Sequence, residues 1–188
     1  DLLCAHALSC ALDQDGSQYG KDTQAALALR PGHPLVCFNH AMLAFTRRAD
    51  MDTAEVARHI HAALKALGNV DPDTLDSSEL NGVHAAPNMN RWRREVAYTY
   101  FDTMDERVRA RRVLQLYIYE MQRVLGVVHC EREEWDRAII PLSRALKIVP
   151  DDGYTLLYLG LAFEKTDRHE QAAAAYSQAI SLEGMFFE

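Results

Sequence analysis

The amino-acid sequence predicts an all-α fold, a right-handed solenoid in which antiparallel helix pairs stack into an α-α superhelix. Three observations support this prediction. The C-terminal part repeats itself every 34 residues, polar turns divide each repeat into two segments of helical periodicity, and Pro or Gly closes each repeat. The composition agrees, because 48% hydrophobic and 25% charged residues are ordinary proportions for a globular protein.

The repeat becomes visible when residues 119–152 are aligned without a gap on residues 153–186, so that matching residues are 34 positions apart. The matching pairs are Leu125-Gly126 with Leu159-Gly160, Ala138 with Ala172, Leu142 with Tyr176, Ala145 with Ala179, Ile148 with Leu182 and Pro150 with Gly184. Chance can produce one or two such matches, but not a whole set of small and apolar residues in one register.

Each unit is expected to be two antiparallel helices, neither of which can bury its apolar face alone. A Gly or an Ala lets two helix backbones approach closely. We therefore expect Gly126 and Gly160 of the first helices to face Ala138 and Ala172 of the second helices. The larger residues Leu142 and Tyr176 lie one turn further along the second helices and are expected to fill the space beside these contacts.

Polar turns separate the helices and close the units. Residues 131–133 and 166–168 are expected to connect the two helices of a unit. Residues 150–152 end one unit and begin the next, because Pro cannot continue a helix and Asp can accept the free N–H groups at a helix start.

These residues resemble the tetratricopeptide repeat (TPR) family over residues 119–184. The last unit carries the family pattern at Leu156, Leu159-Gly160, Phe163, Ala172 and Tyr176, with Gly184 in place of the final Pro. The preceding unit departs from the pattern at Gln122 and His129, where the family prefers aromatic residues. It also carries Pro141 inside its second helix, which predicts a kink because one backbone hydrogen bond is lost.

The N-terminal part follows the pattern less closely. Residues 1–67 are interpreted as degenerate TPR-like helix pairs, with helices at 2–12, 21–29, 35–47 and 53–67. An irregular acidic linker is expected at 68–90, a helical connector at 91–118 and two clear units at 119–188. Residues 105–130 contain no Gly or Pro except Gly126, which predicts one long helix or two joined by a slight bend.

The charge of the chain argues against nucleic acid as its main partner. The net charge is −7, whereas nucleic-acid binding depends on Lys and Arg that neutralise phosphates. Residues 91–118 carry seven arginines and four acidic residues, a local net charge of +3, and a solvated helix face is the simpler interpretation of this stretch.

Membrane and export signals are not evident in the sequence. No stretch reaches the roughly 20 apolar residues of a membrane-spanning helix, and the first residues do not resemble a secretion signal. A cytoplasmic protein without a membrane partner is therefore expected. The chain does not begin with Met, and we expect it to be a fragment or a processed product.

The four cysteines, at positions 4, 10, 37 and 130, are expected to be reduced and buried. Cys37 and His40 have a spacing that can hold a metal ion, and Cys4, His6 and Cys10 lie on a neighbouring predicted helix. The chain nevertheless lacks the paired, closely spaced ligands of a structural zinc site. Neither a metal nor a cofactor is therefore expected.

The sequence contains no recognisable catalytic motif. A Gly-rich nucleophile turn, a phosphate-binding loop and a His-Glu-x-x-His motif are all absent from it. The chain is therefore not expected to be an enzyme. Two classes of function stay open, a protein-binding scaffold and a regulatory or accessory domain of a larger enzyme.

The family resemblance also implies a binding surface, because first helices of TPR units form a concave groove on which peptides lie. The matching positions are Phe38, Asn39, Met42, Phe45, Arg123, Val127, Cys130, Tyr154, Leu157, Tyr158 and Leu161. Packing against the next repeat is an equally open role for the aromatic residues among them. Only Asn39 matches the Lys, Asn and Arg clamp with which some members bind acidic chaperone tails, so such a tail is not expected.

Phe186 and Phe187 follow the last predicted helix directly. Two adjacent aromatic rings are costly to leave in water, since burial of each stabilises by about 2 kcal/mol. We expect a continuation of the chain, the chain's own groove or a second copy to cover them, and a continuation is favoured. Without that continuation the chain is expected to self-associate through this end.

Overall fold

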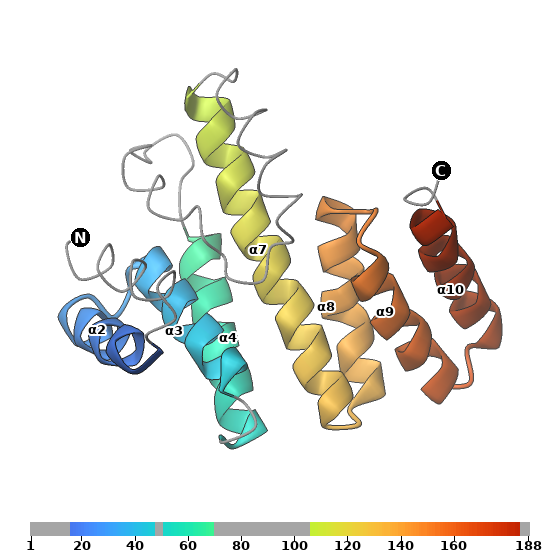
Figure 1. Ribbon diagram of the computed structural model, residues 1–188, viewed down its shortest axis with the longest axis horizontal. Coiled ribbons are helices and arrows are strands. Elements are labelled where there is room, and N and C mark those ends of the chain that lie inside the picture. Colours follow the sequence, from blue (N-terminus) through green and yellow to red (C-terminus); the bar gives the residue numbers. More distant parts are fainter. Residues whose placement is uncertain (1–15, 48–50, 70–105, 185–188) are drawn as a thin grey trace.

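The computed structural model describes residues 16–47, 51–69 and 106–184, and every regular element in these ranges is a helix (Figure 1). The helices are α2 (Gly16–Leu29), α3 (Pro34–Thr46), α4 (Thr53–Gly68), α7 (Glu106–Glu131), α8 (Trp135–Ile148), α9 (Gly153–Lys165) and α10 (His169–Gly184). The all-α prediction is confirmed.

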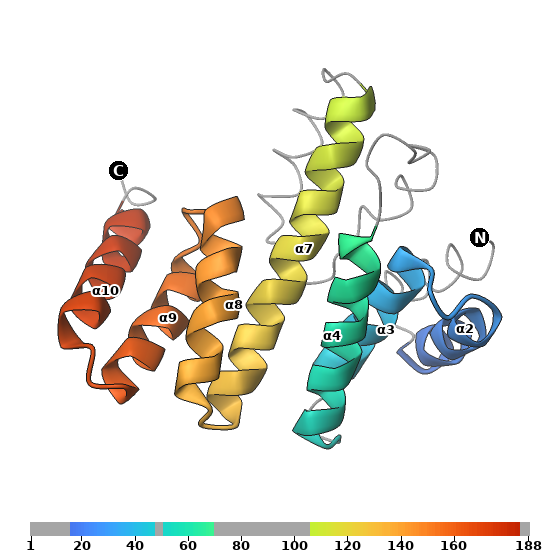
Figure 2. The same cartoon turned by 180° about the vertical axis from the view of Figure 1, so that it is seen from behind.

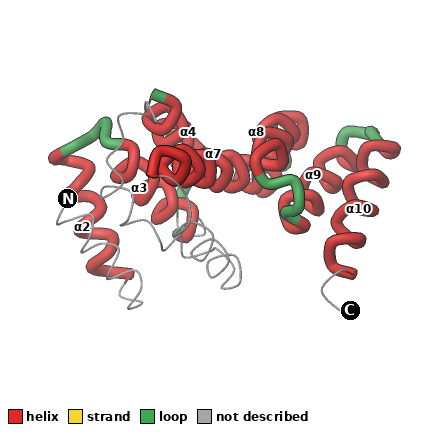
Figure 3. Tube along the Cα trace, turned by 90° about the horizontal axis from the view of Figure 1, so that it is seen from above, coloured by secondary structure: helices red, strands yellow, loops and turns green. Residues whose placement is uncertain are grey.

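The helices form a row of antiparallel pairs, α3 with α4, α7 with α8 and α9 with α10, and α2 lies at one end of the row (Figure 1). Seen from above, α3 and α9 lie on one side of the row, whereas α4 and α8 lie on the other (Figure 3). α7 lies between α4 and α8 and contacts both of them. The first helices α3 and α9 therefore share one side of the molecule.

α7 is the single long helix that was one of the two predicted alternatives, with a length of 26 residues. Its first turns extend beyond the ends of α4 and α8 (Figure 1). Because α7 packs on α4, the units α3/α4 and α7/α8 are neighbours in space although residues 69–105 separate them in the chain. The greater part of the predicted acidic linker, the predicted helix 2–12, and Phe186 with Phe187 lie outside the described residues.

α3 and α4 begin and end within one residue of the predicted helices 35–47 and 53–67. α2 differs, because it begins at Gly16, which was predicted to be part of a turn. Gly20 is buried, and a Cβ atom at that position would lie 3.3 Å from Nη1 of Arg47. Glycine lowers the local helix propensity, yet Gly16 and Gly20 both belong to α2. Gly20 lies at a point of close packing in this helix.

The 34-residue repeat extends to the backbone of the turns. Glu133 and Asp167, which are 34 positions apart, both have a left-handed backbone, with φ of 58° and 60°. The residue after each of them donates its N–H to the carbonyl oxygen five residues earlier, at 2.9 Å in both units. Left-handed residues with such backbone bonds are a common way to end a helix. The two turns are therefore copies of each other.

Gly126 and Gly160 lie where two helices meet, as predicted, and the nearest side chains are the larger residues expected one turn further along the second helices. A Cβ atom on Gly126 would lie 2.5 Å from Cδ2 of Leu142, and one on Gly160 would lie 2.6 Å from Cε1 of Tyr176. The nearest atoms thus do not belong to the alanines four positions earlier. Side chains lean toward the N-terminus of their own helix, so a residue further along the second helix covers the glycine.

The buried side chains form two clusters. One joins α3, α4 and α7 and includes Met42, Ile60 and Val128. The other joins the end of α7 to α8, α9 and α10 and includes Leu142 and Phe163. α9 links the two clusters, because one of its tyrosines, at position 158, packs against both.

α8 continues as a helix through Pro141, which is buried. The kink expected at this residue stays a prediction. None of the described helices is both long and apolar enough to cross a lipid bilayer.

Candidate interaction surface on α7 and α9

A buried polar network fixes the start of α9 against α7. The Tyr119 hydroxyl donates to Oδ2 of Asp152 at 2.6 Å, and the Thr155 hydroxyl donates to the same oxygen. Burial and then the charge of Asp152 raise the pKa of Tyr119, so the phenol keeps its proton and acts as a donor. A buried carboxylate is tolerated here because it receives these two hydrogen bonds.

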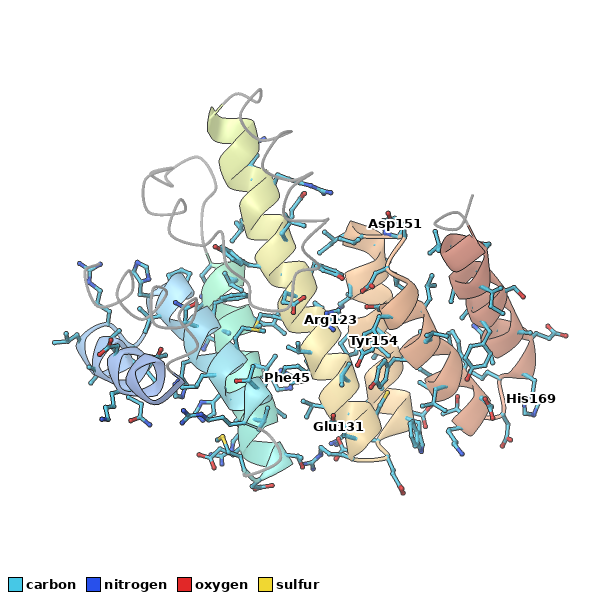
Figure 4. The ribbon with its side chains drawn as sticks, viewed as in Figure 1. Phe45, Arg123, Glu131, Asp151, Tyr154 and His169 are labelled. Carbon is cyan, nitrogen blue, oxygen red and sulfur yellow. The ribbon has the colours of Figure 1, made fainter. Side chains whose placement is uncertain are left out.

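Arg123 lies beside this network, between α7 and α9 (Figure 4). Its Nε and Nη2 atoms donate to the two carboxylate oxygens of Glu120 at 3.0 and 2.5 Å. Both side chains are nearly buried, with exposures of 11% for Arg123 and 8% for Glu120. The guanidinium carbon lies 5.7 Å from the ring centroid of Tyr154. The bidentate ion pair therefore holds a planar cation against an aromatic ring of the next unit.

Tyr154 and Tyr158 are one turn apart on α9 and form a pair. Their ring centroids are 4.8 Å apart, and the Tyr154 hydroxyl donates to the Tyr158 hydroxyl at 3.1 Å. Burial and then the hydrogen bond with Tyr154 raise the pKa of Tyr158 to about 12. Tyr154 is 49% exposed and Leu157 is 42% exposed. This part of α9 therefore presents aromatic and aliphatic surface that also carries the hydroxyls of the two tyrosines.

Few known proteins are similar to the chain in sequence, and more are similar to it in structure. No protein-family model matches the chain. Over 67 residues, which are 36% of the chain, it is 36% identical to a peroxisomal targeting signal receptor of Candida albicans, and the match spans only 11% of that receptor. A crystal structure of MamA is 15% identical, with a TM-score of 0.40 and 94% of each chain covered. The structure of MamA AMB-1 is 15% identical, with a TM-score of 0.41, and the match covers 98% of this chain and 99% of the MamA chain.

The repeated turns, the repeated glycine contacts and the row of antiparallel pairs together decide the fold. It is a stack of antiparallel helix pairs, as the resemblance to the TPR family implied. In this stack α3, α7 and α9 are first helices and α4, α8 and α10 are second helices.

The structure brings some of the predicted binding residues of this stack together. Arg123, Tyr154 and Tyr158 are in contact, and Leu161 lies further along the same helix as the tyrosines and is half-buried. Asn39 is half-buried on α3, which α7 separates from α9 (Figure 1). Asn39 is therefore not part of the tyrosine cluster.

Three predicted binding residues instead belong to the core, and that part of the prediction is wrong. Phe38, Met42 and Val127 are exposed by only 2%, 1% and 0% and lie in the cluster of α3, α4 and α7. Phe45 and Cys130, from the same set, are also buried. The physical reason for Phe38 and Met42 is that α2, α4 and α7 all pack on α3. Val127 lies on α7, which is itself packed against α3, α4, α8 and α9.

The cysteines that the structure describes, Cys37 and Cys130, are free and buried. The Cys37 thiol donates to the carbonyl oxygen of Pro31 at 3.2 Å, and burial raises its pKa. Across residues 16–47, 51–69 and 106–184 no group of three potential metal ligands comes together. Cys4, His6 and Cys10 lie outside those ranges.

Sequence reasoning missed the polar groups beneath the surface. Glu120 and Arg123 are three apart with opposite charges, a spacing that places them on one helix face and could have indicated the ion pair. Tyr119 and Asp152 are 33 residues apart, and nothing in the pattern relates a helix residue to the cap of the next unit.

Proposed function

We propose that the chain is a protein-interaction scaffold and that the exposed side of α9 binds a segment of a partner protein. The surface consists of Tyr154, Leu157, Tyr158 and Leu161. The observation that supports this proposal best is the tyrosine pair, in which the exposed Tyr154 rests on the nearly buried guanidinium of Arg123 and contacts the half-buried Tyr158. Large side chains that are exposed yet already held in place lose little conformational freedom when a partner binds.

The chemistry of the surface favours a partner segment with apolar side chains. The rings and leucines offer apolar area, and the hydroxyls of Tyr154 and Tyr158 can hydrogen-bond backbone groups of an extended or helical segment. The charge of Arg123 is already matched by Glu120, so it adds little attraction for a carboxylate. An apolar helix or extended segment is therefore a better fit than an acidic tail.

The polar groups around the surface are also more consistent with a scaffold than with an enzyme. Tyr119, Glu120, Arg123 and Asp152 are buried or nearly so and are paired with one another or with Thr155, which is typical of a structural role. The matched receptor of Candida albicans is, by its name, a receptor for a targeting signal, and this supports a protein-binding role for the shared stretch.

Affinity capture with variants of the full chain tests this proposal. Proteins captured by the parent should be lost with Tyr154→Ala plus Tyr158→Ala, since central aromatic anchors often contribute about 2 kcal/mol or more to binding. Ile180→Ala, which truncates a 68% exposed residue on α10, is the matched control and should capture the same proteins. Capture that survives the tyrosine changes but is lost with Arg112→Ala would move the binding surface to the basic start of α7.

A further inference from the structure

A cavity lies between α4, α7 and α8. Figure 2 shows these three helices from the side on which α4 and α8 lie. The cavity has a volume of about 660 Å³, which lies within the usual range of volumes for ligand-binding pockets. α7 contributes Ile118, Gln122, Leu125 and His129 to its lining.

These four residues are on the opposite side of α7 from the tyrosine surface. Successive helix residues are rotated by about 100°, so residues 118, 122, 125 and 129 form one narrow stripe. By the same rotation Glu120 and Arg123 fall on the far side of the helix from that stripe. The cavity is thus a separate site from the one that includes Arg123, Tyr154 and Tyr158.

Two of the cavity residues are the positions at which this unit departs from the TPR pattern. In the next unit the equivalent residues are Leu156 and Phe163, which are 3% and 9% exposed and pack in the protein interior. Here they are Gln122 and His129, so an amide and an imidazole replace core hydrocarbon in the cavity wall. Nδ1 of His129 lies 2.7 Å from Oε2 of Glu134, which leaves Nε2 for any further hydrogen bond.

The charge of the cavity is positive. Lys65, Arg137 and Arg144 line it, and none of the described residues in its lining carries a carboxylate. Arg137 lies 3.5 Å from Glu134, whereas Lys65 and Arg144 have no ion pair with another described residue. Burial and then the neighbouring His129 lower the pKa of His61, which favours its neutral form.

Apolar side chains lie among these charges. Leu64 of α4 and Ile140 and Pro141 of α8 complete the lining, and Ile140 is 57% exposed. A cavity with an apolar lining and two cations that form no ion pair within the described parts of the chain can bind a segment that carries both hydrocarbon and carboxylates.

We propose that this cavity binds an acidic segment of a partner protein, with apolar side chains against Ile140 and carboxylates against Lys65 and Arg144. The partner is identified by charge complementarity, since the cationic rim belongs to a protein whose net charge is −7. The site does not depend on the proposed tyrosine surface, because it lies on the other side of α7.

Fluorescence anisotropy of the full chain with a short labelled peptide of glutamates and leucines tests this proposal. Lys65→Glu plus Arg144→Glu should weaken binding by about tenfold or more, whereas Arg112→Glu plus Lys165→Glu, which changes the net charge equally elsewhere, should have little effect. Ile140→Ser should also weaken binding, and a peptide with glutamine in place of glutamate should bind poorly. Unchanged helical circular dichroism verifies that each variant is folded.

Several outcomes would overturn the proposal. The parent could fail to bind the peptide, or the two charge-reversal variants could weaken binding equally. Loss with Tyr154→Ala plus Tyr158→Ala would place the peptide on the other surface. Binding that is strong only after Asp71→Asn plus Asp73→Asn plus Asp76→Asn would assign the cavity to the chain's own acidic segment, and tighter binding of single-stranded RNA would assign it to nucleic acid.

Discussion

The two C-terminal units, α7/α8 and α9/α10, share a backbone and differ in what their first helices carry. Both have a left-handed turn residue and a glycine at the contact between helices, each repeated 34 positions apart. Where α9 buries the hydrocarbon of Leu156 and Phe163, α7 buries the polar Gln122 and His129 to a similar degree, and both border the cavity beside α4. The repeat therefore determines the backbone conformation. The side chains at the pattern positions 122 and 129 can differ from those at 156 and 163 without changing it.

The glycine contact of each unit is also enclosed to a different degree. Leu142, which covers Gly126, is fully buried, and α8 has neighbours on both sides, α7 and α9. Tyr176, which covers Gly160, is only half-buried, and its hydroxyl donates to Glu164 at 2.9 Å. The first unit therefore has less room to adjust to a change at its glycine.

The largest expected effect on stability comes from this difference between the surroundings of Gly126 and Gly160. Gly126→Ala should lower the free energy of unfolding by about 1–3 kcal/mol, because the new Cβ atom would overlap a leucine that cannot move away. Gly160→Ala should be near neutral, since the ring of Tyr176 can turn toward solvent and alanine favours a helix by about 1 kcal/mol. Urea unfolding at neutral pH measures both values.

Gly153→Ala is the control, because Gly153 lies in α9 and a Cβ atom there would have no neighbour within 4 Å. This variant should be at least as stable as the parent. If Gly126→Ala proved as stable as Gly153→Ala, the described contact between α7 and α8 would be wrong.

A smaller effect concerns the link between the two units. Tyr119→Phe removes one hydrogen bond from the buried Asp152 and should lower the free energy of unfolding by about 1–2 kcal/mol. Tyr154→Phe removes a hydroxyl from an exposed pair and should change it little. Equal unfolding midpoints for the two variants in guanidinium would contradict a structural role for the network.

The smallest effect is a pH dependence confined to the first unit. Hydrogen bonds from Arg132 and then His129 lower the pKa of Glu134 from 4.5 to about 2, whereas the equivalent residue of the next unit is Arg168. A lowered pKa contributes stability that is present above pH 4.5 and is lost as the pH falls toward 2. Glu134→Gln should therefore be less stable than the parent at neutral pH, by an amount that shrinks in acid. Thermal unfolding across this pH range measures the gap, and a gap independent of pH would argue against the prediction.

Much of the fold could be predicted from the sequence because the repeat pattern is a packing pattern. Gly126 and Gly160 revealed the register, and helix boundaries followed from polar turns and from Pro150. The rotation of the second helix against the first could not be predicted, since spacing alone does not say that Leu142 rather than Ala138 covers the glycine.

The candidate sites were harder to predict than the fold. Tyr154 and Tyr158 could be placed on a first helix, but the burial of Phe38 and Met42 depends on α2, α4 and α7 packing around α3. The cavity could not be predicted either, because its walls come from three helices in two units and residues 69–105 intervene between α4 and α7.

The most direct test installs the residues of the last unit in the preceding one. Gln122→Leu plus His129→Phe should raise the free energy of unfolding by about 0.5–2 kcal/mol, because the added hydrocarbon in the cavity wall should outweigh the lost hydrogen bond between His129 and Glu134. The same variant should bind the acidic peptide more weakly than the parent does. Lower stability together with unchanged peptide binding would contradict the claim that α7 gives up core packing at these two positions to form a binding site.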